Sequence, residues 1–203
     1  MNKALSCLSL LLFLSACATT QPVPEDRFYR FERIPPPRTL AAPVLRGGLA
    51  VDYVQADPLR SGRAVLYSDR DQPLQLQRYH YEFWVDQPPR LVRQALLTYL
   101  RDSGVADSVI DAADPTGAAY RLHLRLLKFE QVLDRQSAAV EVALQATLLS
   151  GPSDTLLWTR TYTQRQPAGS RQMHASAHAM QLALGEVFAA LQADLAAAPP
   201  RKP

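Results

Sequence analysis

Glycine and cysteine are both scarce in this sequence. Only 8 of the 203 residues are glycine, and neither a Walker loop nor a Gly-x-Gly-x-x-Gly motif occurs. The two cysteines, Cys7 and Cys17, lie near the N-terminus, which excludes a disulfide framework or a cysteine-based zinc site in the body of the chain. No Gly-x-Ser-x-Gly motif marks a nucleophile elbow. The sequence therefore offers no catalytic motif for nucleotide, thiol or serine-hydrolase chemistry.

An excess of charge of one sign is also missing. The 22 basic and 19 acidic residues leave a net charge of +3. Nucleic-acid binding requires a concentrated basic patch, so we predict no nucleic-acid partner. The hydrophobic fraction of 47% is ordinary for a globular protein, and the length suits one domain of about 150 residues with additional segments.

The N-terminus carries the clearest pattern in the chain. Lys3 precedes an apolar run over 4–13, which is too short to span a bilayer because spanning needs about 20 residues. We therefore predict a cleaved signal peptide over 1–16. The run ends on four residues that resemble the bacterial lipobox: Leu14, Ser15, Ala16 and Cys17.

The lipobox resemblance implies that Cys17 is acylated on its sulfur and, after cleavage, on its new amino group. Several acyl chains anchor a protein stably where one does not. Ala18, rather than aspartate, follows Cys17. By analogy with enterobacterial sorting, this implies delivery to the periplasmic face of the outer membrane. The alternative is an ordinary secretory signal with a chance cysteine.

Proline marks the next segment as a tether. Six of the 16 prolines lie within 18–48, and such a stretch favours extended polyproline II at about 3.1 Å per residue, a reach of roughly 90 Å. We predict a lipidated tether over 17–48, interrupted by a short edge strand over 28–31 where three aromatic residues occur. The domain then covers 49–198, and 199–203 forms a frayed tail.

Hydrophobic periodicity predicts the elements of this domain. Alternation predicts strands at 49–54, 64–67, 76–85, 120–129, 140–148 and 156–165, with a bulge at 126–127 where the alternation changes phase. Stripes at three-and-four spacing predict helices over 88–103 and 173–197. We predict an α+β fold in which two helices pack on one face of an antiparallel sheet, in the order β-β-β-α-β-β-β-α.

Two residue pairs are candidates for chemistry, and both have simpler interpretations. His174 and His178 lie four apart on the last helix, but no acidic third ligand lies within the next turn, so solvent-facing residues are favoured over a metal site. Glu130 and Glu141 are placed to face each other across a hairpin, but a solvated face beside arginines is favoured over a catalytic pair. We therefore predict no catalytic and no metal-binding residues.

Other residues are candidates for an interface with a partner. Alternation directs some aromatic side chains of the third strand outward, and arginines line one face of the strand that begins at 120. Such arginines can bind phosphates or acidic groups, although many simply face water. The candidates are Tyr79, Tyr81, Trp84, Arg121 and Arg125.

Several of these features occur in an order that resembles a known family. After the lipobox and the tether come 49–51, 57–67, the pattern Tyr79-x-Tyr81-x-Phe83-Trp84, Pro88-Pro89 before a helix, 120–122, Phe129-Glu130, Trp158 and an alanine-rich last helix. This resembles the PqiC-like ABC-type transport auxiliary lipoproteins over nearly all of the mature chain. The segment Gln72-Pro73 matches no pattern of the family.

The resemblance implies a non-enzymatic subunit with no cofactor other than the lipid on Cys17. Such lipoproteins act with an MCE-domain protein, often with an ABC permease and ATPase, to move phospholipid or other apolar molecules between membranes, and a homo-oligomeric ring is expected. Two alternatives remain. The chain is a lipid-carrying periplasmic lipoprotein with an apolar cavity, or a structural lipoprotein of another envelope assembly.

Overall fold

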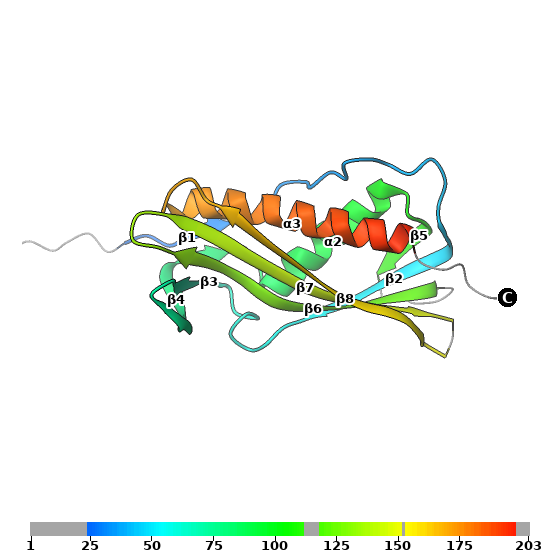
Figure 1. Ribbon diagram of the computed structural model, residues 1–203, viewed down its shortest axis with the longest axis horizontal. Coiled ribbons are helices and arrows are strands. Elements are labelled where there is room, and N and C mark those ends of the chain that lie inside the picture. Colours follow the sequence, from blue (N-terminus) through cyan, green and yellow to red (C-terminus); the bar gives the residue numbers. More distant parts are fainter. Residues whose placement is uncertain (1–23, 112–117, 152, 198–203) are drawn as a thin grey trace, which may run out of the picture.

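The computed structural model describes residues 24–111, 118–151 and 153–197 (Figure 1). The predicted signal peptide, the lipobox with Cys17 and the predicted tail lie outside these residues. The elements are, in chain order, β1 (Arg27–Tyr29), β2 (Leu45–Gln55), β3 (Ala64–Asp69), β4 (Gln72–Trp84), α2 (Pro88–Ser103), β5 (Ala106–Asp111), β6 (Ala118–Leu133), β7 (Ala138–Ser150), β8 (Thr155–Pro167) and α3 (Met173–Ala196).

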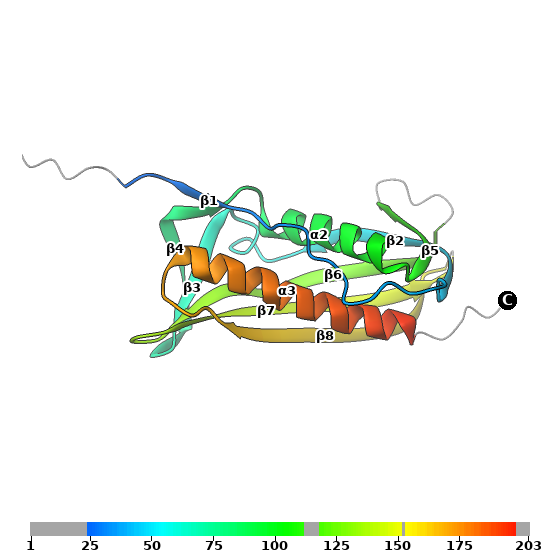
Figure 2. The same cartoon turned by 90° about the horizontal axis from the view of Figure 1, so that it is seen from above.

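The α+β class is confirmed, with two helices on one face of an eight-stranded sheet (Figure 2). The prediction of an antiparallel sheet is wrong, because the sheet is mixed. The antiparallel meander β6–β7–β8 is present, but β6 pairs in parallel with β2 and β3, β2 with β5, and β1 with β4. Residues 106–111 also form a strand that was not predicted. Alternation is the same in parallel and antiparallel strands, so it could not distinguish the two.

Strand β6 organises the sheet because it pairs with two different strands along one edge. Its first half pairs with β2 and its last three residues pair with β3, while β7 follows its other edge throughout. The register to β7 shifts between Leu126 and Lys128, which confirms the predicted bulge. The shift reverses the alternation, so that Phe129 packs in the core next to Trp84, with ring centroids 5.2 Å apart.

Local sequence determines where the helices begin and end. Helix α2 begins on Pro88 and Pro89, whose missing N–H groups cost nothing in the first turn. It ends at Gly104, where φ is +65° and a Cβ atom would lie 3.2 Å from the carbonyl oxygen of Leu40. Helix α2 covers β2 and β5, and α3 covers β7 and β8. Their apolar stripes and the sheet enclose one continuous core.

Residues 30–44, here called the strap, run over the helix layer between α2 and α3 (Figure 2). Ile34 of the strap is buried and lies against Gly185 of α3. Hydrogen bonds fasten the strap along its length: Glu32 N to Gln181 Oε1 (2.7 Å), Arg33 Nη2 to Asp102 Oδ2 (2.9 Å), Thr39 Oγ1 to the Asp102 oxygen (2.9 Å), Leu40 N to the Ser103 oxygen (2.9 Å), and Gln192 Nε2 to the Arg38 oxygen (3.2 Å). Much of the segment predicted as a tether thus packs on the domain.

The aromatic residues at the start of this segment also pack on the domain. The strand expected over 28–31 is present as β1, at 27–29, in parallel with the end of β4. Phe31 then stacks against Trp84 with ring centroids 5.1 Å apart. Burial of aromatic surface is a large favourable contribution, which explains why three aromatic residues interrupt a proline-rich stretch.

Candidate functional site

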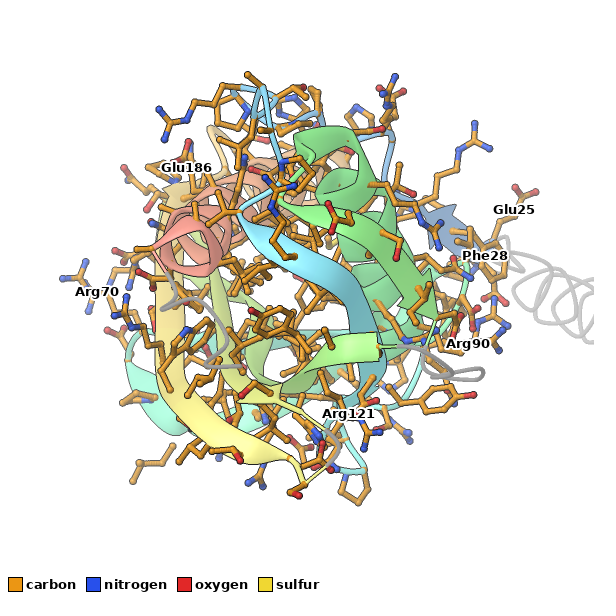
Figure 3. The ribbon with its side chains drawn as sticks, turned by 90° about the vertical axis from the view of Figure 1, so that its right-hand side faces the viewer. Glu25, Phe28, Arg70, Arg90, Arg121 and Glu186 are labelled. Atoms are coloured by element: carbon orange, nitrogen blue, oxygen red, sulfur yellow. The ribbon has the colours of Figure 1, made fainter. Side chains whose placement is uncertain are left out.

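The face of the sheet opposite the helices is open and polar. Because side chains alternate along a strand, the residues of β6 between the buried leucines point to this face. Arg121, His123 and Arg125 are these residues, as the sequence predicted. Figure 3 shows Arg121 on the side of the sheet away from the two helices. Its Nη1 lies 3.1 Å from Asp154 Oδ2, at the turn between β7 and β8.

A hollow of about 460 Å³ lies on this open face. It crosses three neighbouring strands, β2, β6 and β7. Apart from Tyr53, six of its eight lining residues carry polar side chains that can donate or accept hydrogen bonds. The lining consists of Asp52, Tyr53, Gln55, His123, Leu124, Arg125, Gln145 and Thr147.

Tyr53 is an aromatic platform at the edge of the hollow. It is 67% exposed, and the guanidinium carbon of Arg93 lies 4.7 Å from its ring centroid. Arg93 is itself buried and immobilised. It donates hydrogen bonds to the carbonyl oxygens of Val51 (2.9 Å) and Asp52 (3.0 Å). It also donates a hydrogen bond to the carboxylate of Asp111, and this hydrogen bond raises the pKa of Arg93. One face of Tyr53 is thus supported by a fixed cation, while most of the ring is accessible to a partner.

A histidine and an arginine complete the lining of the hollow. His123 Nε2 lies 3.1 Å from Asp52 Oδ2. Arg125 is exposed and makes neither an ion pair nor a hydrogen bond with the described residues. Arginine and tyrosine are both enriched among the energetically dominant residues of protein interfaces.

Glu130 and Glu141 lie directly opposite each other on β6 and β7, as predicted. Each carboxylate is paired with different basic side chains. Glu130 accepts a hydrogen bond from Arg60 (2.7 Å), and Glu141 accepts hydrogen bonds from Lys128 (2.7 Å) and Arg165 (3.0 Å). The hydrogen bond from Lys128 holds the pKa of Glu141 below its ordinary value. A pair in which one acid is held ionised by two cations is a structural network rather than an acid–base pair.

The network around Glu141 predicts a pH-dependent stability. The pKa of Glu141 is lower in the folded state than in the unfolded state, where it is about 4.3. The ionised carboxylate therefore contributes to the free energy of unfolding above its unfolded pKa, and this contribution is lost as the pH falls through the folded pKa. We expect Glu141→Gln to lower the melting temperature by about 2–4 °C at pH 7 and the difference from the native protein to shrink on acidification.

Thermal unfolding followed by circular dichroism at pH 7 and at pH values below 4 checks this prediction. Glu186→Gln is the matched control, because Glu186 is exposed on α3 (Figure 3) and forms no ion pair with the described residues. This control should behave as the native protein does at each pH. A difference for Glu141→Gln that persists or grows on acidification would contradict the network.

The aromatic interface candidates differ in accessibility. Tyr81 is partly exposed. Tyr79 is half-buried and donates a hydrogen bond from its hydroxyl to Gln131 Oε1 (2.7 Å). Trp84 is only 1% exposed and packs between Phe31 and Phe129, so it belongs to the core and is not accessible to a partner. Its burial comes from the strap and the β6 bulge, which alternation within β4 does not reveal.

The two histidines of α3 are both exposed on its first turns, as the simpler interpretation predicted. Within 24–111, 118–151 and 153–197, no three His, Cys, Asp or Glu side chains are grouped so as to hold a metal ion.

Sequence reasoning missed the residues that shape the hollow on the side of β2. Tyr53 and Asp52 lie in a segment that reads as an apolar strand, and Arg93 lies on a helix 41 residues after Asp52. The available signal was local: Tyr53 follows the charged residue Asp52 and is the one aromatic residue in a strand whose aliphatic residues are buried. The support from Arg93 is a tertiary contact and leaves no trace in the local pattern.

The described residues form a mixed sheet with two helices on one face and a polar hollow on the other. A comparison with known families identifies the class more closely. The model of the family described as "ABC-type transport auxiliary lipoprotein component" matches residues 29–192. The chain therefore belongs to this family of auxiliary components of transport systems.

Solved structures share the fold. A crystal structure of protein XCC0632 from Xanthomonas campestris is 24% identical, with a TM-score of 0.72, and the match covers 82% of this chain and 92% of that one. A second crystal structure, of an uncharacterised protein, is 18% identical with a TM-score of 0.60, covering 86% and 98%. The protein CT253 from Chlamydia trachomatis is 9% identical with a TM-score of 0.52, covering 75% and 99%. No curated protein matches the sequence.

Neither α2 nor α3 is long and apolar enough to cross a membrane, and they are the helices of the described part of the chain.

Proposed function

We propose that this protein is a non-enzymatic lipoprotein subunit of an MCE/ABC-type transport system, anchored in the outer membrane through Cys17. In this role it moves no cargo itself. It binds an MCE-domain protein, with or without an ABC permease and ATPase, so that phospholipid or another apolar molecule passes between the membranes. The observation that carries the proposal is the family match over residues 29–192.

The packing of the domain favours this function over a lipid carrier. A carrier needs an apolar cavity. The space between the helices and the sheet is instead filled by large side chains that are fully buried. These include Trp84, Tyr99, Phe129 and Phe188. The hollow on the open face is lined mainly by polar side chains, which suits a protein partner better than an acyl chain.

The open face is the surface that we assign to the MCE-domain partner. Tyr53 presents a rigid aromatic ring, and Arg125 presents a cation with no partner among the described residues. Rigid side chains lose little conformational entropy on binding, so a contact with them contributes more of its energy to affinity. A homo-oligomeric ring, expected from the family resemblance, would place several copies of this face around one partner.

Affinity purification of the tagged lipoprotein from solubilised envelopes tests the proposal. We expect an MCE-domain protein in the eluate, and its recovery to fall about tenfold or more with Arg125→Glu or Tyr53→Ala, because truncation of a dominant interface residue costs more than about 1.4 kcal/mol. Arg38→Glu is the matched control. Arg38 lies on the strap, on the opposite side of the molecule, and its exposed side chain forms no ion pair with the described residues.

Other outcomes would contradict the proposal in distinguishable ways. A monomer that elutes with bound phospholipid and no MCE-domain protein would favour the carrier. Proteins of a different envelope assembly in the eluate would favour the structural lipoprotein. Equal losses of partner with Arg38→Glu and Arg125→Glu would move the docking surface away from the open face.

A further inference from the structure

Several exposed apolar side chains belong to elements at one end of the molecule, with Leu74 near the start of β4 and the others toward the end of β4. Phe28 of β1, Leu74 and Tyr81 of β4, and Val85 directly after β4 are all large apolar side chains with substantial exposure. In Figure 1 these elements lie at the left end, together with the turn between β6 and β7. The turn between β7 and β8 and the last turn of α3 lie at the opposite end.

Leu74 is the most exposed of these side chains. It is 100% exposed and lies beside the turn that joins β3 to β4. Ser68 pairs with Leu76, whereas the next residue, Asp69, pairs with Gln72. Residues 73–75 therefore have no partners on β3 and bulge out of the ladder. Moving a leucine side chain from water into an apolar medium is favourable. An apolar side chain held on a protruding bulge is thus placed for insertion into an apolar medium.

The N-terminal segment reaches the domain at this same end. The first described residue is Pro24, and β1 begins three residues later beside the last residues of β4 (Figure 2). Only six residues lie between Cys17 and Pro24, and the seven steps from one to the other span at most about 25 Å. The strap adds no slack, because its hydrogen bonds to α2 and α3 hold it on the domain.

We infer that the end of the domain formed by β1, the β3–β4 turn and the β6–β7 turn rests on the phospholipid surface. Leu74 inserts at the boundary between headgroups and acyl chains. This inference rests on the acylation of Cys17 in the proposed function, since the anchor is what holds this end near the bilayer. The occupant of this end is a membrane rather than a protein because the short tether keeps Pro24, at this same end of the domain (Figure 2), within about 25 Å of Cys17.

Charged side chains around Leu74 suit the headgroup region. Two exposed arginines form ion pairs here. Arg70 pairs with Asp134 (2.8 Å), and Arg135 pairs with Asp71 (3.6 Å). Arg78 is exposed and pairs with none of the described carboxylates. Arginines rest their aliphatic stems on apolar surface and keep their charge among headgroups. The opposite end of the molecule, separated by the roughly 36 Å length of α3, then points away from the membrane.

A fluorescent label at Leu74 tests the orientation in the lipidated full chain. Leu74→Cys creates the sole free thiol, because Cys7 leaves with the signal peptide and the Cys17 sulfur carries the lipid. The purified protein is labelled with a polarity-sensitive dye and reconstituted in vesicles of phosphatidylethanolamine and phosphatidylglycerol. We expect a blue-shifted emission and about twofold or stronger quenching by a quencher attached to the lipid.

Leu156→Cys is the matched control, since Leu156 is 60% exposed and lies near the turn between β7 and β8 at the opposite end. Its label should keep its emission when vesicles are added. Equal quenching at both positions, or none at Leu74 in a protein that floats with the vesicles, would overturn the orientation and leave the anchor intact. A protein that does not float with the vesicles would overturn the anchor and the orientation together.

Discussion

Leu184→Asp is expected to unfold the domain. Leu184 lies in the middle of α3 and is 0% exposed, packed in the core that α3 shares with the sheet. Removing a buried leucine side chain costs about 2–5 kcal/mol, and an unpaired buried carboxylate adds several more. The sum approaches the whole stability of an ordinary domain, about 5–15 kcal/mol. Thermal and urea denaturation followed by circular dichroism measure the effect.

Leu182→Asp is the control for this substitution. Leu182 lies two residues earlier on the same helix and is 45% exposed, so the new carboxylate remains in water. We expect its free energy of unfolding to stay within about 0.5 kcal/mol of the native value. A stable Leu184→Asp together with an unstable Leu182→Asp would mean that α3 presents its opposite face to the sheet.

Cys17→Ala is expected to abolish lipidation and with it the attachment of the protein to membranes. The sulfur of Cys17 is the atom that the lipobox resemblance assigns to the acyl chains, and alanine has none. The precursor should stay uncleaved, or the protein should appear in the soluble fraction. Labelling of cells with radioactive palmitate, followed by separation of membranes, measures both effects.

Cys7→Ala is the matched control, because Cys7 lies in the peptide that cleavage before Cys17 removes. This variant should incorporate palmitate and sediment with membranes as the native protein does. Normal palmitate incorporation in Cys17→Ala would show that the four residues ending in Cys17 are not a lipobox and that the N-terminus is an ordinary secretory signal.

Local patterns were sufficient for most of the elements. Both helices were predicted within two residues of their observed bounds, because their apolar stripes, the Pro88-Pro89 start and the Gly104 end are local signals. The bulge near Leu126 was also predictable, since a change in the phase of alternation is visible in one strand alone. The family resemblance likewise depended on an order of short local patterns.

Contacts between distant segments escaped prediction. The parallel pairing of β6 with β2 and β3 depends on how the chain crosses the sheet, and alternation carries no information about strand direction. The composition of the strap indicated extended chain but not the surface on which it lies. The hydrogen bonds that fasten it, such as Leu40 N to the Ser103 oxygen, join residues more than 60 positions apart.

The same division applies to the candidate sites. The sequence by itself determined the two helices, the strands with alternating apolar residues and the outward direction of Arg121 and Arg125, because each depends on residues that are neighbours in the chain. The anchor at Cys17 stays a prediction. The tertiary structure alone decided that Trp84 is core, that Tyr53 rests on Arg93, and that Leu74 shares an end with the N-terminal segment. Each of these depends on which strands become neighbours, and strand pairing is a property of the whole chain.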